Sequence, residues 1–136
     1  MEHAPSEKPA GPRREPFSPR ARARSFVYAF RGLRQFFSTE HNAWIHLTAA
    51  AGALVLSILL KISAIQWVGV LFAIGAVLTA EAFNTCVEKM MDKLIPETSE
   101  TVRYVKDLAA GAVLVSAVVA AAIGGLIFIP LIIQLF

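Results

Sequence analysis

Three long runs without a charged side chain constrain this chain more than any other feature. Residues 43–60 and 62–80 contain no Asp, Glu, Lys or Arg over 18 and 19 positions, and none occurs from residue 108 to the end. A helix needs about 20 predominantly apolar residues to cross the hydrocarbon core of a bilayer. The sequence therefore predicts an all-α membrane protein with three membrane-spanning helices, over residues 43–61, 64–93 and 102–133.

The positive charge of the chain is concentrated before the first of these runs. Eight of the 13 Lys and Arg residues precede residue 43, although the net charge is only +3. Basic residues beside a membrane helix bind anionic lipid headgroups and favour the cytoplasmic side. The distribution therefore indicates a membrane as the partner of this chain, and not a nucleic acid.

The same rule predicts a topology. The turn near Lys61 contains one basic residue, whereas residues 88–107 contain four. We expect the N-terminus and residues 88–107 in the cytoplasm, and Lys61 and the C-terminus outside. Under this topology one group of charged residues gathers at the cytoplasmic face: Glu40, Glu81, Glu88, Asp92, Lys106 and Asp107.

The N-terminal region has two parts that differ in composition. Residues 1–20 hold five prolines among scattered charges, which predicts a disordered cytoplasmic tail ahead of a membrane domain over 21–136. Residues 22–38 interleave aromatic side chains with Arg and Gln and are too polar to span. Such a segment fits an amphipathic helix at the membrane surface, with its arginines at the phosphates. An ordinary soluble amphipathic helix is the alternative.

Four polar residues of the second predicted span fall on one face of the helix. Relative to Glu81, the residues Asn84, Glu88 and Asp92 lie at about 300°, 340° and 20° around the axis, an arc of about 80°. Glu81 follows directly on the uncharged run, and an unpaired acid at the centre of a bilayer costs about 2.5–3.5 kcal/mol. We expect this polar stripe to face protein, metal or water.

The polar stripe combines residue types that suit metal and phosphate chemistry. Carboxylate and amide oxygens bind Mg²⁺, which usually takes one or two protein carboxylates together with substrate phosphates. A carboxyl in an apolar setting is suited to act as a general base, and the lysine of the Lys106–Asp107 pair to neutralise phosphate charge. The small residues 109–112 that follow allow helices to approach closely, which would bring this pair to the stripe.

From the residues alone, several interpretations stay open. The stripe suits a metal and phosphate site, but also a structural juxtamembrane face paired with Lys89 and Lys93, as in an assembly or adaptor subunit. It also suits the polar lining of an ion- or proton-coupled transporter. We interpret His41 and His46 as interfacial polar residues, and not as ligands.

Three segments resemble the prokaryotic diacylglycerol kinase/undecaprenol kinase family of small membrane enzymes. EAFNTCVEKMMD (81–92) resembles the family signature E-x-x-N-T-A-I-E-x-x-x-D, and KDLAAGAVL (106–114) resembles K-D-x-A-A-G-A-V-L. Upstream, residues 26–33 and the E-x-N-x-x-x-H pattern at 40–46 resemble the family's surface helix and the segment that follows it. The resemblance covers about residues 22–133, with matching spacing.

The resemblance implies a homotrimer in the bacterial inner membrane, each subunit having a surface helix and three membrane helices, that transfers the γ-phosphate of Mg-ATP to a lipid alcohol. Glu81 would take the proton of the lipid hydroxyl, and Glu40 and Glu88 would bind the Mg²⁺ ions that bridge the ATP phosphates. The lipid substrate would lie at Glu81 and Ala110. The implied ATP-binding residues are Tyr28, Glu40, Asn84, Glu88, Asp92, Lys106 and Asp107.

The resemblance also favours undecaprenol as the lipid alcohol. The pattern of Glu40, Asn42 and His46, together with GLIFIP at 125–130, is closer to the undecaprenol kinase branch than to the diacylglycerol kinase branch. Diacylglycerol, which would give phosphatidic acid, is the alternative. The sequence departs from the family pattern at two dipeptides, Cys86-Val87 in place of Ala-Ile, and Tyr104-Val105 at positions that are commonly small.

Overall fold

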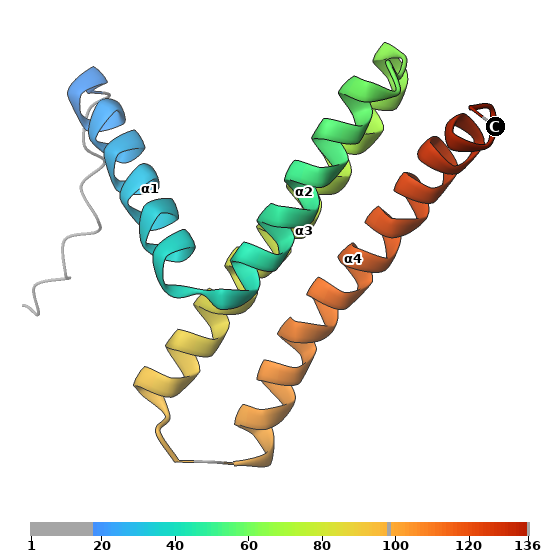
Figure 1. Ribbon diagram of the computed structural model, residues 1–136. Coiled ribbons are helices and arrows are strands. Elements are labelled where there is room, and N and C mark those ends of the chain that lie inside the picture. Colours follow the sequence, from blue (N-terminus) through green and yellow to red (C-terminus); the bar gives the residue numbers. More distant parts are fainter. Residues whose placement is uncertain (1–17, 98, 136) are drawn as a thin grey trace, which may run out of the picture. The chain divides into compact units, whose positions relative to one another are not determined.

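The computed structural model describes residues 18–97 and 99–135, and every regular element in this part of the chain is an α-helix. The helices are α1 (Pro19–Thr39), α2 (His41–Leu59), α3 (Ala64–Leu94) and α4 (Glu100–Ile133) (Figure 1). The last three are each long and apolar enough to cross a membrane. The predicted all-α fold with three candidate membrane spans is therefore confirmed, and assembly as a homotrimer stays a prediction.

The chain divides into two units between residues 33 and 34. The described part of the first unit, residues 18–33, forms the larger part of α1. This helix begins at Pro19, whereas the predicted tail extends to residue 20. Proline is tolerated in the first turn of a helix, because an amide there has no partner within the helix. The rest of the predicted tail, residues 1–17, lies outside the described residues.

Within the first unit, the aromatic side chains of α1 are exposed. Phe26, Tyr28 and Phe30 each expose more than half of their surface. The guanidinium of Arg31 lies over the ring of Tyr28, 5.9 Å from its centroid, within the range of a cation–π contact. Exposed rings beside arginines are what a helix at a membrane surface presents, and that location stays a prediction.

Within the second unit, α2 and α3 are joined by a tight turn at Lys61. The amide of Lys61 donates to the carbonyl of Ile58 at 3.2 Å. Lys61 has a φ of 49°, a left-handed conformation that costs a non-glycine residue about 1–2 kcal/mol. Ser63 then begins α3 with a capping box, in which the side chains of Ser63 and Gln66 each accept from the other's backbone amide. The turn makes α2 and α3 antiparallel neighbours.

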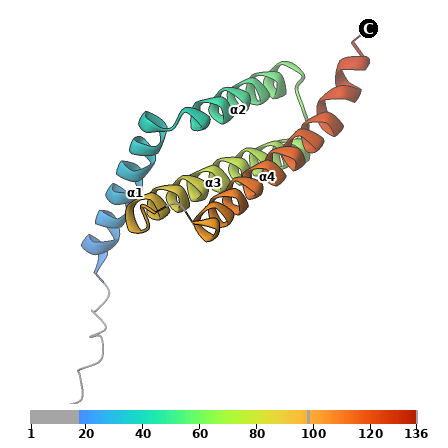
Figure 2. The ribbon, with the colours of Figure 1, turned by 90° about the horizontal axis from the view of Figure 1, so that it is seen from below.

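α4 packs mainly against α3, whereas α2 contacts α3 less and α4 least (Figure 2). Gly69 belongs to the α3–α4 contact, since a Cβ atom there would lie 3.5 Å from the side chain of Ile127 and 3.6 Å from that of Ile123. Small residues permit such close approach between membrane helices. Many large apolar side chains of the three helices are uncovered in the single chain, as expected for helices that face lipid or further helices.

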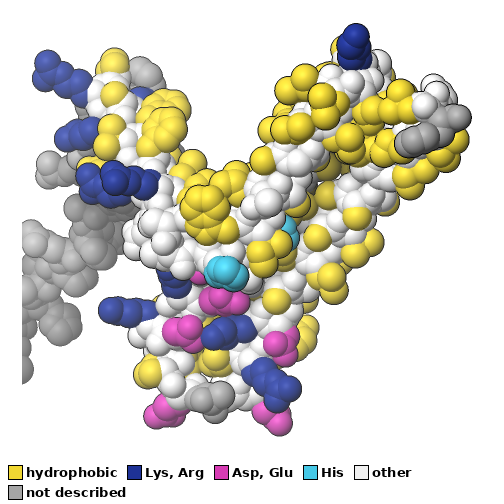
Figure 3. Space-filling view, viewed as in Figure 1, with side chains coloured by type: hydrophobic (Ala, Val, Ile, Leu, Met, Phe, Trp, Pro, Cys, Tyr) yellow, Lys and Arg dark blue, Asp and Glu magenta, His cyan; other side chains and the backbone are white. Residues whose placement is uncertain are grey.

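Most charged side chains of the second unit gather at one end of it (Figure 3). Acidic and basic side chains lie together where α3 ends and α4 begins, and hydrophobic side chains cover most of the remaining helix surface in this view. Lys61 lies in the turn that precedes α3, at the opposite end of that helix. The charged end is therefore the candidate location of a catalytic site.

Candidate active site

The polar stripe of α3 changes from buried to exposed along the helix. Glu81 and Asn84 expose only 3% and 6% of their surface, Glu88 is half-buried, and Asp92 is exposed. Thr85 is also buried and adds a hydroxyl beside Asn84. A buried polar group without a partner costs about 1–3 kcal/mol, so the surroundings of these side chains matter.

Glu81 faces His46 of α2. The Nε2 atom of His46 lies 3.9 Å from Oε2 of Glu81. The carboxylates of Glu40 and Glu88 are close enough to act on Glu81 electrostatically, and the side chain of Asn42 lies beside it. Glu81 thus lies within electrostatic reach of two further carboxylates at the charged end of the second unit, and such a concentration of negative charge attracts cations.

Asn84 links two members of the polar stripe. Its Nδ2 atom donates to Oε1 of Glu88 at 3.2 Å, one helical turn further along. Its Oδ1 atom is buried and has no hydrogen-bond partner within the described residues. Buried acceptors are nearly always paired, so an unpartnered one points to a group that is absent from the single chain, such as an ion, a water or a ligand.

Glu40 lies between α1 and α2 and is joined to α3 through Lys89. The Nζ atom of Lys89 lies 2.6 Å from Oε1 of Glu40 and 3.3 Å from Oγ1 of Thr39. The Thr39 hydroxyl is 2.7 Å from the same Glu40 oxygen. The hydrogen bond from Lys89, followed by that from Thr39, lowers the pKa of the Glu40 carboxyl below its ordinary value. Glu40 is therefore ionised at neutral pH.

The lysine and the aspartate at the start of α4 have different surroundings. The Nζ atom of Lys106 lies 2.8 Å from Oδ1 of Asp92, and Glu88 is within its electrostatic reach. Asp107 is exposed and pairs with Arg103 on the preceding turn, at 3.8 Å between Nε and Oδ2. The structure therefore brings Lys106 to the polar stripe and leaves Asp107 apart from it.

Two further predicted site residues have no contact that tests their roles. Ala110 is exposed on α4. Tyr28 belongs to the first unit. The contacts implied for Ala110 with the lipid, and for Tyr28 and Asp107 with the nucleotide, stay predictions.

His46 and Lys89 are site residues to which the sequence assigns no part in the chemistry. His46 is four residues after Asn42, so both lie on the same face of α2, and this spacing is a usable signal. Lys89 is expected only as a partner for the acids of its own helix. Its contact with Thr39 spans 50 positions of the chain, and helical periodicity carries no information about such a contact.

The oxygen donors of this region fit a divalent cation that is shared with phosphates. No group of three His, Cys, Asp or Glu side chains in residues 18–97 and 99–135 is arranged to hold a metal by itself. Glu40 and Glu88 both act on Glu81, and the unpartnered Oδ1 atom of Asn84 lies in the same stripe. Mg²⁺ usually takes one or two carboxylates and completes its coordination with phosphates and water. The residues present fit that arrangement.

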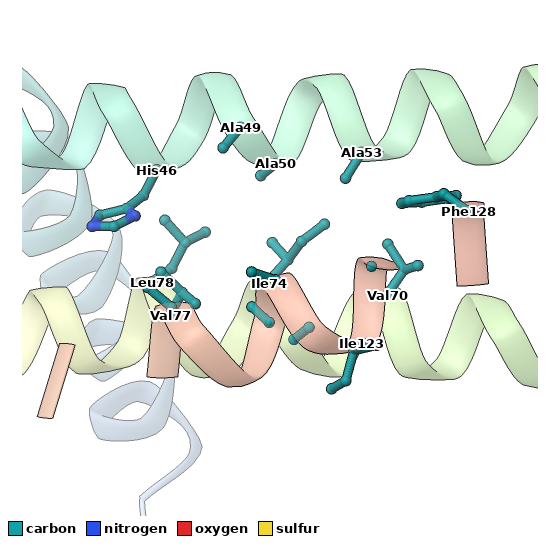
Figure 4. A pocket seen from close by; sticks show the side chains of 15 residues that line it. His46, Ala49, Ala50, Ala53, Val70, Ile74, Val77, Leu78, Ile123 and Phe128 are labelled. Atoms are coloured by element: carbon teal, nitrogen blue, oxygen red, sulfur yellow. The ribbon is translucent and has the colours of Figure 1, made fainter. Parts of the chain in front are cut away.

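An apolar cavity of about 290 Å³ lies between α2, α3 and α4, with His46 at one end (Figure 4). Alanines of α2 face branched side chains of α3 across it. Because His46 also contacts Glu81, the cavity ends beside the buried carboxylate. Besides His46, the labelled side chains of α2 and α3 that line it are Ala49, Ala50, Ala53, Val70, Ile74, Val77 and Leu78.

Together these features define a class of protein: one whose described residues form helices with three candidate membrane spans, an acidic site at one end of them, and an apolar cavity that reaches this site. Residues 27–128 match the prokaryotic diacylglycerol kinase family. The match covers most of the chain, and the protein therefore belongs to this family of prokaryotic membrane lipid kinases.

Two relatives illustrate the range of the family. The chain is 37% identical over 107 residues to the undecaprenol kinase of Bacillus subtilis, a match that covers 79% of this chain and 87% of that protein. It is 32% identical over 107 residues to the diacylglycerol kinase of Synechocystis sp., covering 78% of this chain and 61% of that protein. The two names give different lipid alcohols, so membership defines a lipid kinase without defining its substrate.

Proposed function

We propose that the protein is an ATP- and Mg²⁺-dependent lipid kinase that transfers the γ-phosphate of ATP to undecaprenol, giving undecaprenyl phosphate. The position of Glu81 carries the proposal: it is a buried carboxylate beside an apolar cavity, with two further carboxylates within electrostatic reach. A lipid alcohol needs an apolar site for its chain and a polar site for its hydroxyl. The nucleotide needs cations beside its phosphates. The cavity and the carboxylates at this end of α3 are suited to bind the lipid alcohol and the cations, respectively.

In this proposal Glu81 is the general base. It accepts the proton of the lipid hydroxyl while the hydroxyl oxygen attacks the γ-phosphorus, and the bond from that phosphorus to the leaving ADP oxygen breaks. His46 is 3.9 Å from Glu81, which is too long for a hydrogen bond. In this proposal His46 restricts the orientation of the Glu81 carboxylate by contact.

Glu40 and Glu88 are the proposed metal ligands, and Asn84 positions Glu88 through their 3.2 Å hydrogen bond. A bound Mg²⁺ would neutralise charge on the β- and γ-phosphates. Lys106, which Asp92 holds at the polar stripe, is suited to contact the same phosphates. Three other contacts rest on the family resemblance alone: Tyr28 and Asp107 with the nucleotide, and Ala110 with the lipid.

The comparison of the two relatives favours undecaprenol over diacylglycerol. The relative named undecaprenol kinase has the higher identity of the two, 37% against 32%, and the larger share of its length is matched. Diacylglycerol is the second candidate, because both the family description and the other relative carry its name.

The proposed setting is the bacterial inner membrane, with the charged end of α3 on the cytoplasmic side, the C-terminus outside, and three copies forming the enzyme. The concentration of basic residues before α2, at the end of α3 and at the start of α4 supports this orientation. The orientation would let ATP arrive from the cytoplasm while the lipid hydroxyl arrives from within the bilayer.

A transfer assay tests the proposal. The purified full-length protein in lipid–detergent micelles is incubated with γ-labelled ATP and either undecaprenol or diacylglycerol, with Mg²⁺ or with a chelator. We expect label on undecaprenol, less on diacylglycerol, and none with the chelator. A preference for diacylglycerol would replace the substrate and keep the chemistry. An adaptor or a transporter would label neither lipid.

A further inference from the structure

The contact between Lys89 and Glu40 is short although it lies near the surface. Lys89 reaches from α3 to the segment between α1 and α2, where its ammonium lies 2.6 Å from Oε1 of Glu40 and 3.3 Å from the hydroxyl of Thr39. The side chain of Lys89 is 54% exposed. Ion pairs with this exposure contribute about 0–1 kcal/mol to stability, so holding the fold together is a small part of what this contact does.

The surroundings of Glu40 give the contact a second consequence. Glu40 is one of two carboxylates within electrostatic reach of Glu81, and Glu88 is the other. Like charges repel, and a cation beside Glu40 reduces its repulsion of Glu81. Lys106 is engaged by Asp92 further along the stripe. Lys89 is thus the lysine that supplies a full positive charge directly at Glu40.

We propose that Lys89 is a positioning residue that occupies the cation position on Glu40 while no nucleotide is bound, and that a divalent cation displaces it. The proposal rests on the proposed function in one respect, because it requires Glu40 to be a metal ligand. An ammonium 2.6 Å from a carboxylate oxygen repels a divalent cation bound to the same carboxylate. Without nucleotide, the ion pair keeps the site ordered and lowers its affinity for free cations, so that a divalent cation would bind only together with the nucleotide's phosphates.

Binding of Mn²⁺ without nucleotide tests this proposal directly. The free-ion electron paramagnetic resonance signal of Mn²⁺ is followed during titration of the full-length protein in detergent. Lys89→Met removes the ammonium and keeps most of the apolar stem. We expect it to bind Mn²⁺ about five- to tenfold more tightly than the unmodified protein, because one repelling charge has gone. Lys89→Arg keeps a cation at Glu40 and should restore the original affinity.

Lys93→Met is the matched control. It removes the same charge from the same end of α3, and Lys93 makes no ion pair within the described residues. We expect its Mn²⁺ affinity to stay within about twofold of the unmodified protein, since an exposed charge without contact to Glu40 is screened. Thermal unfolding of each variant confirms that it is folded before it is titrated.

Two outcomes would overturn the proposal and identify what failed. If Lys89→Met binds Mn²⁺ no more tightly than Lys93→Met, Lys89 is only a brace for Glu40. Glu40→Gln would still raise the metal concentration required for phosphate transfer, and the proposed function would stand. If the tighter binding appears but persists after Glu40→Gln is added to Lys89→Met, the cation binds elsewhere. The role of Glu40 as a metal ligand then fails as well.

Discussion

The two halves of α3 share one backbone conformation and have opposite surroundings. From Ala64 to Ala80 the helix has no charged side chain, packs against α4 and lines the cavity. From Glu81 to Leu94 it is connected to other segments by ion pairs and contacts of defined geometry, at His46, Glu40 and Lys106. The role proposed for the first half depends on the shape and volume of the cavity. The role proposed for the second half depends on the positions of individual charged and polar groups. A substitution in the first half should therefore change lipid binding, and one in the second should change catalysis.

Glu88→Gln tests the second half of α3, from Glu81 to Leu94, which we call its polar half, and is expected to cause a large loss of activity. The substitution keeps the size of the side chain and an oxygen that accepts from Asn84, but it removes the negative charge proposed to bind the metal. We expect kcat to fall about 10²- to 10³-fold, equivalent to a few kcal/mol of transition-state stabilisation. The measurement is the initial rate of phosphate transfer at saturating ATP and lipid. Glu97→Gln, in the exposed loop before α4, is the control, and equal rates for both variants would remove Glu88 from the site.

Asn84→Ala should have the next largest effect. It releases the Glu88 carboxylate and removes the unpartnered buried Oδ1 atom. Loss of a group that orients a metal ligand typically costs about 10- to 100-fold in metal affinity or activity. We expect the Mg²⁺ concentration at half-maximal rate to rise about tenfold. Thr79→Ala, in the apolar half of the same helix, should leave it unchanged, and a similar rise in both variants would indicate general loosening of α3.

Ala53→Leu tests the apolar half through the cavity. Ala53 lines the cavity from α2, and a larger side chain would occupy space that the proposal gives to the lipid chain. We expect KM for undecaprenol to rise about fivefold while KM for ATP stays constant, since overpacking of this kind costs about 1–3 kcal/mol. Ala51→Leu is the control, because Ala51 is exposed on the same helix and does not line the cavity. An equal effect of both substitutions would mean that the cavity does not hold the substrate.

The smallest expected effect is the contribution of the Glu40–Lys89 pair to the free energy of unfolding, and the change of this contribution with pH. The pKa of the Glu40 carboxyl is lowered in the folded chain, so the unfolded chain binds a proton at this carboxyl more readily. The ion pair therefore stabilises the folded chain at pH values above the ordinary pKa of 4.5. This stabilisation is lost as the pH falls through the lowered pKa. We expect Lys89→Met to reduce the free energy of unfolding by about 1 kcal/mol or less at pH 7. This difference should shrink as the pH falls below 4.5, which thermal unfolding in detergent measures; a constant difference would mean that Glu40 is not its source.

The same contrast between the halves explains how much of the fold and the site can be predicted from the sequence. The three candidate spans follow from apolar runs, and the polar stripe follows from helical spacing, because both are local properties of the chain. Lys106 and Asp107 are adjacent in sequence but about 100° apart around α4, so only one of them meets the stripe.

Contacts between helices are the part that the sequence does not predict. Lys89 meets Thr39 across 50 positions of the chain, and His46 meets Glu81 from another helix. Both depend on how α2 packs against α3, and packing is set by the shapes of many side chains together. The resemblance to a known family implies roles for matching residues, but it does not predict the contact of Lys89 with Glu40 and Thr39.

The most direct test of the central claim is the rate of phosphate transfer by Glu81→Gln. This substitution preserves the shape of the buried side chain and removes its ability to accept a proton from the lipid hydroxyl. With ATP, Mg²⁺ and undecaprenol saturating, we expect transfer to fall about 10²- to 10⁴-fold relative to the unmodified protein, while helix content and oligomeric state are unchanged. Near-normal transfer by a folded Glu81→Gln protein would contradict the account.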